Sequence, residues 1–142
     1  MEESIKEMIV ERFQLPKVDI KTYSSLALAY IGDGIFDLVI RTIVVGQGNT
    51  SANRLHIQTS KIVKAASQAA MMEELMTELT EEELEVYRRG RNAKSHSIAK
   101  NASVMDYRNA TGFEALMGYL YLTNQMERMM DLVEIGLNEL KG

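Results

Sequence analysis

A single proline, Pro16, occurs among the 142 residues, and this scarcity constrains the fold more than any other feature. Proline lacks a backbone N–H and breaks helix interiors, so its absence after position 16 permits long helices through the rest of the chain. Apolar positions recur at helical spacing, and no segment alternates apolar and polar residues over the length of a strand. The sequence therefore predicts an all-α fold class, with residues 1–142 forming a single domain.

Start and stop signals divide the chain into helices. A first helix is expected from Glu3 to Phe13, and Ser24 or Ser25 should cap a long apolar helix that runs to about Val45 and closes at Gly46. Thr80 followed by a glutamate three residues later forms a capping box. The other expected elements are a third helix to about Ala70 with a continuation over Met71–Met76, a helix from the capping box to about Arg89, a polar loop from Gly90 to Tyr107, and helices over Asn109–Leu122 and Gln125–Leu140.

Cysteine is absent, which excludes disulfide scaffolds, thiolate zinc sites and cysteine nucleophiles. The N-terminus carries Glu2 and Glu3 where a secretory signal would have basic residues and an apolar run. No stretch of about 18 uncharged apolar residues is present. These features predict a cytoplasmic protein.

The net charge of −4 is unevenly distributed along the chain. Seven glutamates lie between residues 73 and 85, and the remainder of the chain carries +3. The next residues are rich in positive charge and contain one acid, Asp106; the basic residues are Arg88, Arg89, Arg91, Lys94, Lys100 and Arg108. Because the local field decides whether a phosphate backbone is attracted, the acidic total does not exclude a nucleic-acid partner.

Two acids stand within apolar helical segments. Asp33 is flanked by Gly32 and Gly34, and Glu114 is the only charged residue between Arg108 and Glu127. Glycine inside a helix costs about 1 kcal/mol relative to alanine, so the pair around Asp33 indicates a close approach to the backbone there. An ionised carboxylate among apolar residues needs a partner or a bound cation. Each acid alone could instead lie on the polar edge of an amphipathic helix or pair with an arginine such as Arg41 or Arg91, but the repeated setting favours oxygen ligands for Mg²⁺.

Other candidate groups fit structural roles better. Asp37 lies one turn beyond Asp33, and pairing with Arg41 at the four-residue spacing explains it better than direct metal binding. His56 and His96 could serve in acid–base chemistry, but for His56 a structural or RNA-contact role carries more weight.

The same residues carry a resemblance to the ribonuclease III family. The segment from Tyr30 to Ile35 resembles the family signature, and the segment from Phe113 to Leu122 resembles its second catalytic helix. The match covers about Ser24 to Leu122. Four further segments are similar to the Mini-ribonuclease III branch in particular: Arg54–His56, Gln68–Ala69, Tyr87–Lys94 and Ala110–Glu114.

The resemblance implies an all-α endonuclease domain, without a separate double-stranded-RNA-binding domain, in which Asp33 and Glu114 are the catalytic residues and the Mg²⁺ ligands. It also implies a homodimer that cuts double-stranded RNA, leaves 5′-phosphates and matures the precursor of large-subunit ribosomal RNA. The chain departs from the family pattern twice, with Ala29 and Thr111 where the larger enzymes have acids. The metal shell should therefore contain fewer direct carboxylates, and Asp106 or Ser103 is a candidate replacement.

The basic segment after residue 87 is the candidate RNA-binding surface, expected as a loop. Its predicted RNA-binding residues are Arg88, Arg89, Arg91, Asn92, Lys94 and Lys100, supported by the polar groups of Ser95, Ser97 and Asn101. Residues 88–100 contain no aromatic side chain that could stack on single-stranded bases, which favours double-stranded RNA. Two alternatives stay open: a non-catalytic RNA-binding or ribosome-associated module, and a helical regulatory dimer that uses Met126, Met129 and Met130 on a protein partner.

Overall fold

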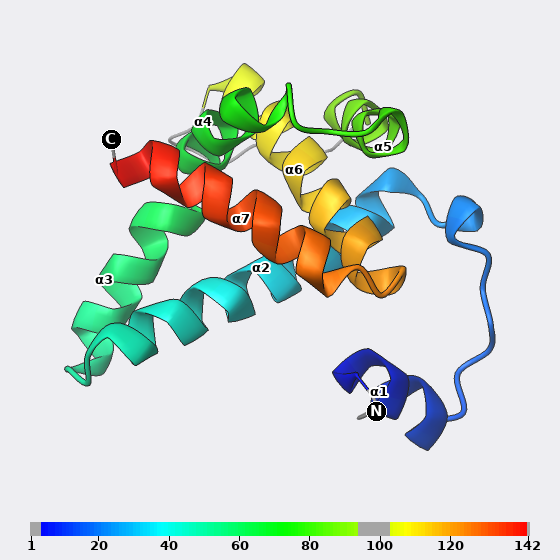
Figure 1. Cartoon of the computed structure of the whole chain (residues 1–142), viewed down its shortest axis with the longest axis horizontal. Helices are drawn as coiled ribbons and strands as arrows, with labels where there is room; N and C mark the ends of the chain where they lie inside the picture. Colours follow the sequence, from blue (N-terminus) through cyan, green and yellow to red (C-terminus); the bar gives the residue numbers. More distant parts are fainter. Residues whose placement is uncertain (1–3, 94–102, 142) are drawn as a thin grey trace.

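The computed structural model of the chain describes residues 4–93 and 103–141 (Figure 1). Within these ranges it is all-helical, as the sequence predicts, and no helix there is both long and apolar enough to cross a membrane. The elements are α1 (Ile5–Arg12), the short 3₁₀ helix η1 (Ile20–Thr22), α2 (Ser25–Gln47), α3 (Ala52–Val63), α4 (Ala65–Leu75), α5 (Glu81–Arg91), α6 (Val104–Leu122) and α7 (Met126–Lys141).

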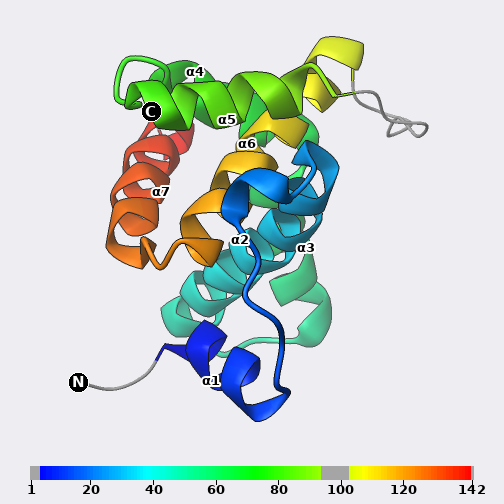
Figure 2. The same ribbon diagram turned by 90° about the vertical axis from the view of Figure 1, so that its right-hand side faces the viewer.

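Helix α6 lies at the centre of the molecule, in contact with α2, α4, α5 and α7 (Figure 2). Its buried side chains include Phe113, Leu116 and Met117, and a helix that is apolar around most of its circumference belongs in a core. The ring of Phe113 meets Phe36 of α2 edge-to-face at a centroid distance of 4.9 Å. Burying each such side chain contributes about 1.5–3 kcal/mol of stability, so α6 organises the fold.

Helix starts follow the predicted caps. The side chain of Ser24 accepts a hydrogen bond from Ala27 N, and Thr80 and Glu83 form the expected capping box. Glu83 has a second role that the sequence did not indicate. Glu83 is only 4% exposed, and its carboxylate accepts two hydrogen bonds from Arg128 of α7, at 2.8 and 2.9 Å. One of the seven clustered glutamates thus ties α5 to α7.

Two predicted helix boundaries are wrong. Helix α2 continues through Gly46 to Gln47, and Gly48 is its C-cap. The break between the third and fourth helices falls at Lys64, not near Ala70. The break occurs there because the residues that follow turn inward, and Met71, Met72 and Leu75 are buried in the main core. No glycine or proline marks that position.

The predicted loop from Gly90 to Tyr107 is also wrong at both ends, because α5 runs to Arg91 and α6 begins at Val104. Gly90 does not break the helix. A Cβ atom at Gly90 would stand 2.8 Å from Ala115 Cβ and 3.0 Å from Gly112 Cα, so this glycine permits α5 to pack closely on α6. Ser103 caps α6 by accepting a hydrogen bond from Asp106 N. The central part of the predicted loop, residues 94–102, lies outside the described residues.

Helix α1 stands apart at the end of an extended segment (Figures 1 and 2). It begins at a capping box formed by Ser4 and Glu7, and none of its residues is buried. Lys6 Nζ donates a hydrogen bond to the carbonyl oxygen of Leu122 at 3.1 Å. Apolar side chains of this helix and the segment after it, including Ile5 and Phe13, are exposed.

Candidate active site

Asp33 of α2 and Glu114 of α6 are brought side by side where these two helices cross. The crossing is unusually close, because a Cβ atom at Gly32 would stand 1.7 Å from the carbonyl oxygen of Glu114. On the other helix, a Cβ atom at Gly118 would stand 2.0 Å from the carbonyl oxygen of Leu28. The two glycines therefore allow backbone to meet backbone, and this contact sets the positions of the two acids.

The two glycines that flank Asp33 differ. Gly32 confirms the expectation of a close approach to the backbone. Gly34 does not, since no described atom beyond its immediate neighbours and its own helix backbone lies within 4 Å of a Cβ placed there. That side of α2 is open, and Asp33 itself is exposed.

The carboxyl group of Glu114 is partly buried, and its pKa is raised to about 8. Burial is the main cause, because the charged form loses solvation. Asp33 adds to the shift through a hydrogen bond and through repulsion between two negative charges. Gln68 acts in the opposite direction by donating a hydrogen bond to the carboxylate. Without a cation, the carboxyl group of Glu114 therefore keeps its proton near neutral pH.

Gln68 of α4 completes the immediate surroundings of Glu114. Its Nε2 lies 3.5 Å from Glu114 Oε2 and donates to the carbonyl oxygen of Val63 at 2.9 Å. Its Oε1 is buried and has no hydrogen-bond partner among the residues that the structure describes. Gln68 was not predicted to belong to the site, although the segment Gln68–Ala69 is part of the family resemblance. Its own sequence signal is an uncharged polar residue in a helix of small and apolar side chains.

The chemistry of these groups fits a hard divalent cation. Two adjacent carboxyl groups beside an unpaired amide oxygen form a cluster of oxygen atoms, and a cation would relieve the repulsion between the two acids when both are charged. Within residues 4–93 and 103–141, no group of three or more acids, histidines or cysteines could hold a metal. A protein contribution of two carboxylates matches the habit of Mg²⁺, which keeps several water ligands.

The other acids and hydroxyl groups considered from sequence have separate roles. Asp37 accepts a hydrogen bond from Arg41 Nε at 2.6 Å, so the predicted structural pair is confirmed. Thr111 is buried, and its hydroxyl donates to the carbonyl oxygen of Tyr107. The hydroxyl oxygen of Ser103 accepts the capping hydrogen bond of α6, and Asp106 lies eight residues, about 12 Å along the helix, from Glu114. None of these groups joins the pair.

His56 is exposed on α3, and His96 lies outside the described residues.

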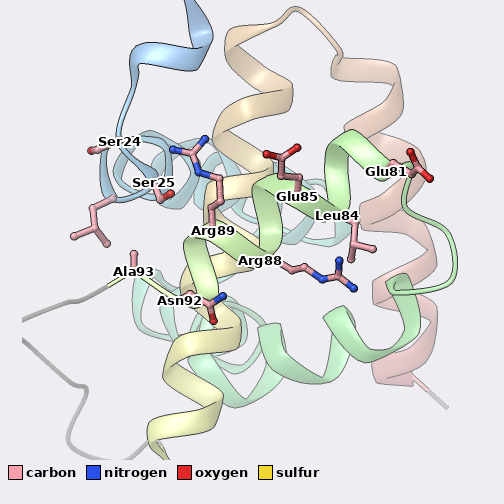
Figure 3. A pocket seen from close by; sticks show the side chains of 10 residues that line it. Ser24, Ser25, Glu81, Leu84, Glu85, Arg88, Arg89, Asn92 and Ala93 are labelled. Carbon is pink, nitrogen blue, oxygen red and sulfur yellow. The ribbon is translucent and has the colours of Figure 1, made fainter.

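Of the basic residues predicted to bind RNA, Arg88, Arg89 and Arg91 lie in the C-terminal half of α5. Arg88 and Arg89 are exposed and extend in different directions from this helix (Figure 3). Together with Asn92 and the start of α2 they line an open groove of about 900 Å³, which does not include Asp33 or Glu114. Arg91 lies over the Tyr87 ring, with its Cζ 5.7 Å from the ring centroid. Lys94 and Lys100 lie outside the described residues.

Helix α5 packs against the part of α6 that carries Glu114. Gly90 meets Ala115 and Gly112, and a Cβ atom at Gly112 would stand 2.7 Å from the Tyr87 ring. The hydroxyl group of Tyr87 donates to Asn109 Oδ1 at 3.1 Å. Both crossings on α6, with α2 and with α5, thus use glycine, and they place the paired acids and the exposed arginines on neighbouring helices.

The chain is similar to known proteins over most of its length. The Ribonuclease III domain family matches residues 26–125. Proteins named Mini-ribonuclease 3 are similar over most of their length. The Clostridium tetani protein is 44% identical over 88% of this chain and 83% of its own, and the Enterococcus faecalis protein is 51% identical over 81% and 89%. The Thermoanaerobacter protein is 43% identical over 96% of both chains.

A solved structure shows the same fold. The crystal structure of a Fusobacterium nucleatum protein superimposes with a TM-score of 0.77 at 30% sequence identity, covering 86% of this chain and 98% of that one. The family match includes both helices that carry the paired acids. The chain therefore belongs to the ribonuclease III family, among the proteins similar to Mini-ribonuclease 3.

Proposed function

We propose that Asp33 and Glu114 form the catalytic centre of a Mg²⁺-dependent nuclease that cuts double-stranded RNA. As a member of the ribonuclease III family, the chain is an endoribonuclease. The observation that carries the assignment of the site is the pairing of these two acids across the α2–α6 crossing, where Asp33 lies close enough to oppose ionisation of Glu114.

Asp33 and Glu114 would hold the metal ion. When bound, Mg²⁺ supplies a Lewis acid that activates water and neutralises charge on the phosphate. Asp33 is exposed and is available to a substrate at the surface, whereas Glu114 is partly buried and accepts a hydrogen bond from Gln68. Loss of the proton from Glu114 would leave a second negative carboxylate next to Asp33 for the cation. Hydrolysis that leaves 5′-phosphates and 3′-hydroxyls follows the pattern of the family.

The arginine side chains at the C-terminal end of α5 would hold the RNA backbone. Arg88 and Arg89 are exposed, their helix packs against the part of α6 that carries Glu114, and Asn92 adds a polar group in the same groove. Arginine contacts phosphates, and amides bond 2′-hydroxyls in the shallow minor groove of duplex RNA. Arg91, Lys94 and Lys100 belong to the same proposed surface.

A homodimer is part of the proposal. Helix α2 leaves Leu26, Tyr30 and Leu38 exposed at spacings of four and eight residues, so they share the face that also contains Gly34. Tyr30 is 84% exposed. A second copy of the chain would bury this face. Sedimentation at micromolar concentration should show a dimer, and a fully active monomer would remove this part of the proposal.

The proposed substrate is the precursor of large-subunit ribosomal RNA, from the similarity to the Mini-ribonuclease 3 proteins. Digestion of duplex RNA with and without Mg²⁺ tests the activity, and mapping of the cut ends on precursor RNA tests the substrate. Cutting only with Mg²⁺, with 5′-phosphate ends, is expected. Binding of duplex RNA without any cutting would instead indicate a non-catalytic RNA-binding module.

A further inference from the structure

Two polar side chains, Ser67 and Gln68, follow the break between α3 and α4. Lys64 is extended, with φ −68° and ψ 155°, and the next helix begins directly after it. Ser67 and Gln68 in the first turn of α4 bond back to α3. The hydroxyl of Ser67 donates to the carbonyl oxygen of Lys61 at 2.6 Å, and Nε2 of Gln68 donates to that of Val63 at 2.9 Å. Both side chains satisfy carbonyl groups at the end of a helix.

Only Gln68 of this pair also reaches the paired acids. The same Nε2 lies 3.5 Å from Glu114 Oε2, across 46 residues of sequence. Gln68 is 1% exposed, so its side chain has one fixed environment. It therefore connects the helix break to the carboxyl group of Glu114.

The amide oxygen of Gln68 is not explained by the helix break. A buried acceptor without a partner costs about 1–3 kcal/mol, and Ser67 shows that a small hydroxyl is sufficient to satisfy a carbonyl group at this break. Oε1 and Nε2 belong to one amide group, so the unpaired oxygen lies at the end of the side chain that meets Glu114. The amide oxygen of Gln68 can therefore accept a hydrogen bond from a group that enters the site together with a bound ligand. A hydrated cation brings such donors, because Mg²⁺ retains several waters.

We propose that Gln68 is a positioning residue of the metal site. Its amide nitrogen orients Glu114, and its amide oxygen accepts a hydrogen bond from the hydration shell of the divalent ion. The inference rests on the proposed function of Asp33 and Glu114 and extends it to a residue that does not bind the metal directly. Partners of this outer kind typically control metal affinity or activity by about 10–100-fold.

The test compares Gln68→Met with Ser67→Ala. Both substitutions remove a hydrogen bond at the same helix break, but only the first removes a contact with Glu114. The affinity for Mg²⁺ alone, measured by calorimetry without RNA, should fall about 10–100-fold in Gln68→Met and stay unchanged in Ser67→Ala. The Mg²⁺ concentration for half-maximal cutting should rise in parallel, with KM for RNA unchanged at saturating metal. Equal Mg²⁺ affinities in the two variants would overturn the proposal.

A second measurement uses the unaltered protein, so it does not depend on the folding of a variant. In a nuclear magnetic resonance titration with Mg²⁺, the side-chain amide signal of Gln68 should shift with the midpoint of metal binding. The amide of Gln125, which donates to Thr123 Oγ1 at 2.7 Å in another part of the chain, should not. A Gln68 signal that stays in place while Mg²⁺ binds would contradict the proposal.

These outcomes separate this inference from the proposed function. If the unaltered protein does not bind Mg²⁺, the assignment of Asp33 and Glu114 fails. If it binds Mg²⁺ and loses that binding in Asp33→Asn but not in Gln68→Met, only the role of Gln68 fails.

Discussion

At the scale of single residues, Gly32 and Gly34 are close in sequence and opposite in surroundings. Alanine at position 32 would place a methyl group 1.7 Å from the carbonyl oxygen of Glu114, so α2 and α6 would have to separate. We expect Gly32→Ala to destabilise the fold by about 3 kcal/mol or more, beyond the usual cost of overpacking, and to abolish cleavage.

The matched control is Gly34→Ala, which meets open space. Alanine is the better helix former by about 1 kcal/mol, so the free energy of unfolding of the isolated chain should stay the same or rise. Urea denaturation of both variants measures the difference. Equal destabilisation by the two substitutions would contradict the close crossing at Gly32.

The pKa of Glu114, raised to about 8, makes the metal-free protein sensitive to pH. The folded chain binds this proton at a pH where the unfolded chain, with an ordinary glutamate pKa, has released it. Stability from this group therefore decreases as pH rises from about 4.5 to about 8. We expect Glu114→Gln to be more stable than the unaltered protein at pH 8 in a metal chelator, by about 1–2 kcal/mol after allowance for partial exposure, and to lose this advantage near pH 5. Denaturation at several pH values checks both. A difference between the two proteins that does not change with pH would count against a raised pKa.

At the scale of helices, the ion pair of Glu83 with Arg128 ties the start of α5 to α7. Glu83 accepts hydrogen bonds from Thr80 N and from two nitrogens of Arg128, which also donates to the carbonyl oxygen of Glu78. Removing the charge of a buried, paired carboxylate costs about 2–3 kcal/mol, which we expect for Glu83→Gln. Glu81→Gln, an exposed change in the same turn, should cost less than about 0.5 kcal/mol.

The pH dependence of this pair has the opposite sign to that of Glu114. Arg128 lowers the pKa of Glu83, so the stability from the pair is present at neutral pH and is lost as pH falls below the ordinary glutamate range. Thermal unfolding at pH 7 and pH 3 compares the two variants. If Glu83→Gln were as stable as Glu81→Gln at pH 7, the ion pair of Glu83 with Arg128 would not contribute to the stability of the fold.

The exposed arginines of α5 also belong to this scale. Basic residues near a helix C-terminus are favoured by the helix dipole, so their presence alone does not require a ligand. If they contact phosphates, replacing Arg88 and Arg89 by glutamine should weaken duplex-RNA binding and reduce the slope of log K against log salt by about 0.7–0.9 per lost contact. Binding isotherms in Ca²⁺ at three salt concentrations measure this. The control is the double variant Lys61→Gln with Lys141→Gln, which removes two exposed basic side chains from other helices. If the arginine variant had the same salt slope as this control, α5 would not belong to the proposed interface.

Helices were predictable where their signals are local. Ser24, Thr80 and the spacing of apolar residues lie within a few positions of the boundaries they set, and these boundaries are as expected. The break at Lys64 has no local signal, because it depends on the burial of Met71 and its neighbours against other helices. The prediction that a loop begins at Gly90 is wrong for the same reason, because the role of this glycine is its contact with α6.

The site was predictable to the same extent. Asp33 and Glu114 can be singled out from the sequence because a charged carboxylate in an apolar helix is unfavourable without a partner or a cation. Their pairing cannot, because it depends on the crossing of α2 and α6. Gln68 lies 46 residues from the carboxylate it contacts, and nothing in its own segment indicates that contact.

At the scale of the whole molecule, the fold brings together groups from three helices. Helix α6 contributes Glu114, α2 contributes Asp33 through a glycine crossing, and α4 contributes Gln68 through a helix break. Burying the carboxyl group of Glu114 next to Asp33 is unfavourable, and the apolar core around Phe113 and Leu116 supplies the stability that offsets it. The fold thus tolerates two adjacent acids whose repulsion is relieved by protonation of Glu114 or by a bound cation.

The most direct test is single-turnover cleavage of duplex RNA in saturating Mg²⁺ by Asp33→Asn and Glu114→Gln. Binding of the same RNA is measured in parallel in Ca²⁺. Both variants should fold and bind RNA, and each should lose cleavage by more than the roughly 10–100-fold that outer-shell partners control. Cleavage at the unaltered rate by either variant would contradict the assignment of that acid to the catalytic pair.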